Sequence, residues 1–184
     1  MDTSQRRQWF AIAAIGRDRP GIVADLSECV FNCGCNLEDA SMTMLGSEFA
    51  TLMLVSGTEP DLAAKLAGTT KRLEWERSLT IFVRHLDGEP AVEAPGAQEH
   101  SLKAIGVDRA GIVAGVSRCL ADHEVLIDDL RGRVVPIPQS GTPLYELSLR
   151  MRLPAGLKVS ALEDALAVVA ESLDVEISLD SHAD

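Results

Sequence analysis

Two short segments of the chain combine an acidic side chain, a basic side chain and a glycine, a set that suits a small charged ligand. They are Asp18–Val23 and, ninety residues later, Asp108–Val113. In each, the glycine precedes apolar residues at helical spacing, so a helix is predicted to begin there. The first N–H groups of a helix lack partners inside it and favour a carboxylate, while Asp18 or Asp108 could accept a bond from an ammonium group. The pattern therefore suits the zwitterion of an amino acid.

The candidate binding residues are Asp18, Arg19, Gly21, Ile22 and Val23 in the first segment, and Asp108, Arg109, Gly111 and Ile112 in the second. A structural interpretation of the same residues stays open. In it the aspartates are helix N-caps, the glycines serve tight turns, and no ligand binds. The protein would then be an interaction or dimerisation module.

The two segments belong to an internal repeat. Ten of fifteen positions are identical between Ile15–Cys29 and Ile105–Cys119 at a constant offset of ninety residues. A period of half the chain predicts two tandem domains of one fold. We expect them at residues 1–86 and 100–184, joined by residues 87–99, which hold four acids, two prolines and no basic residue. That composition is typical of a linker.

Each half has the pattern strand, helix, hairpin, helix, strand. The expected strands cover residues 9–15, 37–45, 49–55 and 79–83, and then 102–105, 126–135, 144–153 and 175–179. One helix stripe contains Ile22, Val23, Leu26 and Val30, and a capping box of Ser160 and Glu163 is predicted to open the last helix. The order βαββαβ, present twice, predicts an α+β fold of two ferredoxin-like domains, each with two helices on one face of a four-stranded antiparallel sheet.

The two halves differ in the polarity of the sheet face that the helices leave free. Apolar and polar residues alternate in Tyr145–Leu153, as expected for a strand with one wet face, whereas Trp9–Ile15 and Phe49–Val55 are apolar on both faces. An apolar surface of that size is unusual on a monomer. We expect the second domain or another copy of the chain to cover it; a better-buried sheet without a partner is the alternative.

Composition excludes several classes of protein. The 184 residues are 46% hydrophobic with a formal net charge of −11, which is ordinary for a globular chain and argues against nucleic-acid binding. Every apolar run is far shorter than the roughly 20 residues of a membrane span. Arg6-Arg7 before an apolar stretch resembles an export signal, but that stretch belongs to the duplicated unit. We therefore interpret it as a strand.

The thiols and the other reactive residues do not form a catalytic pattern. Cys29, Cys33 and Cys35 cluster, and Cys119 repeats Cys29, but the spacing is not a usual zinc pattern. Cys29 and Cys119 lie beside the apolar helix stripes, so buried hydrophobic roles are favoured over a thiol metal carrier. Free thiols in this number fit the cytoplasm. There is no Gly-x-Ser-x-Gly elbow, P-loop or dinucleotide fingerprint. The four histidines, His100 among them, are scattered along the chain, and we expect them in solvent. We expect neither an enzyme nor a metal protein.

The segments Ile15–Val23 and Gly34–Asp39 resemble the signature of ACT domains, small regulatory modules that bind amino acids. The resemblance covers both halves. It implies that Asp18, Arg19, Gly21, Ile22 and Val23 lie in the effector loop, and that Asn36 supplies an amide at the start of the second strand. The second copy departs from the pattern, since Ala110 replaces Pro20 and Leu126 replaces Asn36.

The resemblance also implies a function. Stand-alone tandem members of the family are transcription regulators without a DNA-binding module. They repress through a protein partner such as a transcription activator, and glycine or a similar small amino acid is the signal. No cofactor is implied, and a homodimer is compatible with the pattern.

Overall fold

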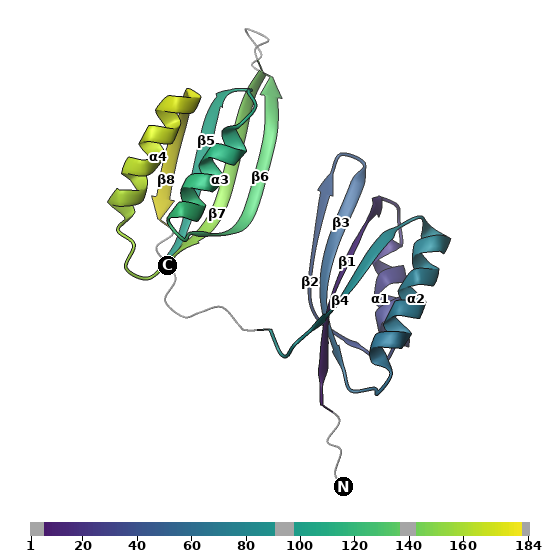
Figure 1. Ribbon diagram of the computed structural model, residues 1–184. Helices are drawn as coiled ribbons and strands as arrows, with labels where there is room; N and C mark the ends of the chain where they lie inside the picture. The colour runs from purple at the N-terminus through teal and green to yellow at the C-terminus, as the bar shows by residue number, and fades with distance from the viewer. Residues whose placement is uncertain (1–5, 91–97, 137–142, 182–184) are drawn as a thin grey trace. The chain divides into compact units, whose positions relative to one another are not determined.

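Apolar strands and amphipathic helices alternate in the order βαββαβ, twice, so the predicted α+β, ferredoxin-like arrangement is confirmed (Figure 1). The computed structural model describes residues 6–90, 98–136 and 143–181. The chain divides into two compact units, Met1–Val92 and Glu93–Asp184. Within the described ranges, none of the helices has the length and apolar character needed to cross a bilayer.

The first unit is a four-stranded antiparallel sheet of order β2-β3-β1-β4, with both helices on one face (Figure 1). Its elements are β1 (Gln8–Arg17), α1 (Ile22–Asn32), β2 (Asn36–Leu45), β3 (Glu48–Gly57), α2 (Leu62–Arg77) and β4 (Thr80–Leu86). Strand β2 lies at one edge of the sheet, and its residues are exposed along the whole length of the strand.

The second unit repeats this topology with the order β6-β7-β5-β8. Its elements are β5 (Gln98–Val107), α3 (Ile112–Asp122), β6 (Leu126–Pro136), β7 (Pro143–Leu153), α4 (Val159–Leu173) and β8 (Val175–Ser181). Strand β5 begins inside the segment expected to be a linker, because Gln98 and Glu99 pair with Leu153 and Arg152 of β7.

The core of each unit lies between the sheet and the helices. In the first unit Phe10, Ile12 and Met53 of the sheet pack with Leu62 and Leu66 of α2, all of them buried. The second unit has an equivalent cluster of its own. The predicted stripe of α1 is right for Ile22, Leu26 and Val30, which are buried, but wrong for Val23, whose side chain is exposed.

Two other local predictions were also wrong. The N-cap of α4 is Lys158, without a side-chain capping bond, so Ser160 and Glu163 do not form a capping box. His100, expected in solvent, is buried on β5, where its Nδ1 lies 3.3 Å from the carbonyl oxygen of Gln98.

Strand pairing places the entry and exit of each unit at one end of its sheet. Trp9 near the start of β1 pairs with Leu86 at the end of β4, and His100 of β5 pairs with Ser181 of β8. The β1–α1 loop lies at the opposite end. The backbone N–H of Asp18 donates there to the carbonyl of Ser47 in the β2–β3 turn, over 3.0 Å.

Candidate functional site

The loop between β1 and α1 leaves the start of the helix open. Gly21 is the N-cap and has the left-handed conformation, with φ 88°, which favours glycine. A Cβ added to Gly21 would meet no atom within 4 Å. Among the described residues, the backbone N–H groups of Val23 and Ala24 have no acceptor. The helix therefore presents free donors, with the positive end of its dipole, to an open approach.

A cluster of three charged side chains borders this approach. Nη2 of Arg19 lies 2.6 Å from Oδ2 of Asp25, in the first turn of α1, and Nε of Arg77, the last residue of α2, lies 3.0 Å from the same oxygen. The hydrogen bond from Arg19, together with the charge of Arg77, lowers the pKa of the Asp25 carboxyl. Two cations share one carboxylate, so this cluster of three side chains has a net positive charge.

The sequence-predicted residues of this loop divide into two groups. Asp18, Arg19, Gly21 and Val23 lie together at the surface around the open amides, although Arg19 is engaged with Asp25. Ile22 is buried and anchors the helix to the core instead of facing a ligand. The carboxylate of Asp18 has no bonding partner among the described side chains, so it is available to a ligand.

Asn36 lies elsewhere in the unit. It begins β2, whereas the turn beside Asp18 follows the end of that strand, about 30 Å away at 3.3 Å per residue. The amide Nδ2 of Asn36 donates to Oε1 of Glu38 over 2.9 Å, and Ser56 and Arg7 bond the same carboxylate. The first unit therefore does not bring Asn36 to its own loop.

The loop of the second unit keeps the glycine but changes the surroundings. Gly111 is also a left-handed N-cap, with φ 106°, and Ile112 is buried. Gly115 stands where the first unit has Asp25, and Nη2 of Arg109 instead lies 3.3 Å from Oδ2 of Asp174. Asp108 is exposed, and its backbone N–H donates to the carbonyl of Pro143 over 3.1 Å.

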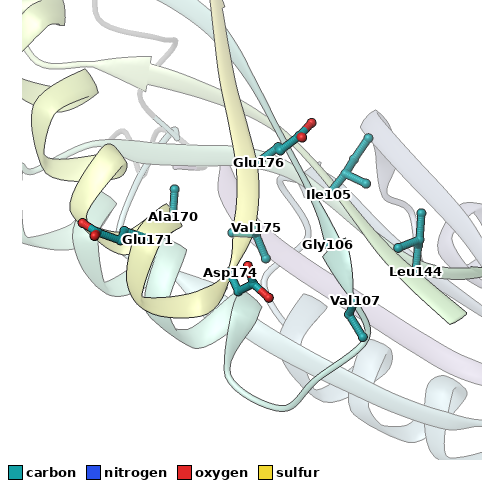
Figure 2. A pocket seen from close by; sticks show the side chains of 9 residues that line it. All are labelled: Ile105, Gly106, Val107, Leu144, Ala170, Glu171, Asp174, Val175 and Glu176. Carbon is teal, nitrogen blue, oxygen red and sulfur yellow. The ribbon is translucent and has the colours of Figure 1, made fainter. Parts of the chain in front are cut away.

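An open hollow of about 590 Å³ adjoins the end of β5 in the second unit (Figure 2). Its apolar walls include Ile105, Val107 and Leu144, and the carboxylates Glu171, Asp174 and Glu176 also line it. These acids disfavour the carboxylate of an amino acid. The first loop is consequently the better match to a zwitterion.

Sequence reasoning missed Asp25 and Arg77. An acid in the first turn of a helix is a recognisable signal, because it complements the helix dipole. The approach of Arg77, fifty-two residues away along the chain, is not visible in the sequence. It follows from the packing of α1 and α2 on the same face of the sheet (Figure 1).

We expect Asp25→Asn to lower the stability of the first unit in a pH-dependent way. The pKa of Asp25 is lowered on folding, so its contribution is complete above the ordinary value of 3.8 and is lost as the pH falls through the folded value. Thermal unfolding from neutral pH to about pH 2 should show the two proteins converging in acid. Glu28→Gln, on the same helix, is the control. If it lowers the stability as much as Asp25→Asn does, the pairing of Asp25 with the two arginines is not the cause of the loss.

All four cysteines are free and buried, as predicted for Cys29 and Cys119. Burial raises the pKa of the Cys29 and Cys35 thiols to about 11 in each case, with a smaller contribution from the neighbouring Cys33. Neutral thiols are poor metal ligands. In the described part of the chain, no group of three or more His, Cys, Asp or Glu side chains is arranged to hold a metal ion.

Comparison with known proteins identifies relatives of one unit and of the whole chain. A family model described as ACT domain matches residues 8–83. The glycine cleavage system transcriptional repressor of Escherichia coli (strain K12) is 26% identical over 178 residues, covering 96% of this chain and 92% of that protein. A UPF0237 protein of Methanopyrus kandleri is 38% identical over 77 residues, which are 41% of this chain and 86% of that protein.

A solved structure matches both units together. The crystal structure of an unknown protein from Galdieria sulphuraria is 30% identical, has a TM-score of 0.80, and covers 97% of this chain and 100% of that chain. The topology, its duplication and the loop at each first helix define a tandem ferredoxin-like regulatory module. Residues 8–83 match the ACT-domain family, and the chain resembles the glycine cleavage system transcriptional repressor over nearly its whole length.

Proposed function

We propose that this protein is an amino-acid-sensing regulator, similar to the glycine cleavage system repressor, that controls transcription through a protein partner. The similarity along the whole chain supports the regulatory role. The observation that supports the sensing role is the open start of α1, where left-handed Gly21 exposes amides and a carboxylate, that of Asp18, for which the described residues provide no partner.

The loop of the first unit would bind glycine or a similarly small amino acid by its two charged ends. The carboxylate would accept hydrogen bonds from the amides of Val23 and Ala24, where the helix dipole and the nearby Arg19 favour negative charge. Asp18 would hold the ammonium group. Ile22 fixes the position of these donors by its burial in the core. No cofactor takes part.

The remaining candidate residues have lesser roles in this proposal. Asp108, Arg109, Gly111 and Ile112 form a weaker second loop, because acidic side chains surround it. Asn36 would reach an effector only as a contribution from another ACT domain, since its own loop lies at the far end of β2.

Effector binding would regulate by differential affinity. A ligand shifts a regulator between two arrangements only as far as it binds one of them more tightly. The effector would thereby change the surface that is offered to a protein partner, such as a transcription activator. The protein would contact no DNA itself, which agrees with its net charge of −11, and it would work in the cytoplasm, where its four thiols stay reduced.

The proposal is tested by the stabilisation that amino acids give to the purified protein. Glycine at 100 times its Kd should add about 2.7 kcal/mol to the free energy of unfolding of the first unit. Asp18→Ala should abolish this shift and leave the fold intact. Thermal unfolding with glycine, serine and larger amino acids measures the effect and its size limit.

Asp108→Ala is the matched control, because it makes the same change at the equivalent position of the second unit. It should keep the glycine shift. If no amino acid stabilises the wild-type protein, or if Asp18→Ala keeps the full shift, the loop is not the sensor. The chain would then be an ACT-type interaction module without a ligand.

A further inference from the structure

The face of the first sheet that the helices leave bare is apolar at its centre. It is formed by Ala11, Ala13 and Ile15 of β1 and Ala50, Leu52 and Leu54 of β3, and is called here the open face. Leu52 is 57% exposed, and Phe82 on β4, which pairs with Ala13 on the other side of β1, is 61% exposed. On the other side of the same strands Phe10, Ile12 and Met53 are almost fully buried. A surface patch of this kind marks an interaction site.

The second unit shows that the fold does not require such a surface. At the positions of Ala13 and Leu52 it has Lys103 and Ser148, which pair in the same register. Leu54 corresponds to Arg150, and Phe82 corresponds to Ser178. The same topology therefore carries a polar, charged face in one unit and an apolar face in the other. The apolar character of the open face is a property of its sequence that folding alone does not explain.

The open face is complementary to itself. Strand pairing sets one large residue beside one small residue in three successive rows, as Ala11 with Leu54, Ala13 with Leu52, and Ile15 with Ala50. If a second copy is placed on this face by a two-fold axis parallel to the strands, β1 of one copy faces β3 of the other. Each large side chain then meets a small one. Facing sheets pack in this way about 10 Å apart, crossing by about 30°, so the match is best in the central row.

Charges at the rim agree with the same axis. Asp39 on β2 and Arg84 on β4 lie at the two ends of the row that contains Leu54 and Ala11. The two-fold axis exchanges the edges of the sheet, so Asp39 of each copy faces Arg84 of the other. In the next rows Ser41 faces Phe82, and Thr43 faces Thr80. No like charges are brought together.

The area is also sufficient for a specific contact. Four strands of up to ten residues give a face of roughly 600 Å² in projection, and protruding side chains increase the accessible area. Specific interfaces bury about 800 Å² on each partner. We propose that the open face is the interface of a two-fold symmetric homodimer, in which the first sheets of two chains pack face to face. This proposal does not depend on ligand binding by the loop.

The oligomeric state of the full chain tests the proposal. The wild-type protein should have twice the 19.7 kDa chain mass in sedimentation velocity at tens of micromolar. Ala13→Lys should raise the dimer dissociation constant by about 100-fold or more, because an unpaired charge would be buried. The substitution is compatible with the fold, since the second unit has lysine at this position. Lys103→Ala is the matched control and should remain dimeric.

A charge exchange tests the two-fold axis itself. Arg84→Asp should weaken the dimer about fivefold by opposing two carboxylates, and Asp39→Arg combined with Arg84→Asp should restore it. Circular dichroism spectra and unfolding temperatures show that each variant is folded. A monomeric wild-type protein would overturn the proposal, because something other than a second copy would then have to cover the open face. A dimer that survives Ala13→Lys, or a double variant without recovery, would overturn it as well.

Discussion

Phe10→Ala is expected to reduce the free energy of unfolding of the first unit by about 3–5 kcal/mol. Phe10 is 1% exposed in the core, and its ring packs edge-on against His85 with centroids 5.0 Å apart. A domain of this size has a total stability of about 5–15 kcal/mol, so the first unit should come close to unfolding. The second unit has a separate core and should remain folded.

Hydrogen exchange measured on peptides separates the two units in this experiment. Exchange should accelerate in residues of β1, β3 and α2 and stay slow in α3, α4 and β7. Phe31→Ala makes the same change at an exposed position of α1 and should alter stability by no more than about 0.5 kcal/mol. A parallel loss of protection in the second unit would show that the two units do not unfold independently.

Alkylation of Cys29 and Cys35 is expected to be at least about 100-fold slower in the folded protein than in guanidinium at pH 8. Burial raises the pKa of each thiol from 9.0 to about 11, so the reactive thiolate becomes about 100-fold scarcer. The same shift predicts that the free energy of unfolding falls as the pH rises from 9.0 toward about 11, because the unfolded thiols ionise first.

Mass spectrometry of peptides after timed reaction with iodoacetamide measures each thiol separately. A cysteine introduced at exposed Ser172 of α4 is the control and should react at the rate of the unfolded chain. Fast reaction of Cys29 or Cys35 under native conditions would mean that the end of α1 opens readily. The two thiols would then be accessible to oxidants.

The repeat made the fold predictable. Because Ile15–Cys29 and Ile105–Cys119 agree at ten of fifteen positions, each half supports the interpretation of the other, and the βαββαβ order follows from the apolar patterns. The loop residues around Gly21 could be predicted for the same reason. A glycine directly before an amphipathic helix indicates its N-terminus, and the structure places that glycine in the left-handed conformation.

The parts that escaped prediction depend on contacts between distant segments. Glu38 and Asp128 were expected on regular strands, but each lies at a β-bulge, where the register shifts by one residue. Glu38 forms an ion pair with Arg7, and Asp128 forms an ion pair with Arg152 of β7. A bulge adds one residue to one strand only, and the alternation of apolar residues does not record it. The separation of Asn36 from its own loop likewise required the strand register.

The position of the chain ends in the first unit limits how a conformational change at the Asp18 loop can reach the rest of the chain. Trp9 and Leu86 are paired neighbours at one end of the first sheet, and the Asp18 loop is at the other. The covalent connection to the second unit therefore departs from the end of the sheet opposite the Asp18 loop, where the proposed effector would bind. A conformational change at the Asp18 loop therefore does not move the connecting segment directly. It must be transmitted along the length of the strands, through the edge strand or the faces of the sheet. Because its two chain ends are neighbours, such a unit can also be inserted between other domains without disturbing the end that carries the Asp18 loop.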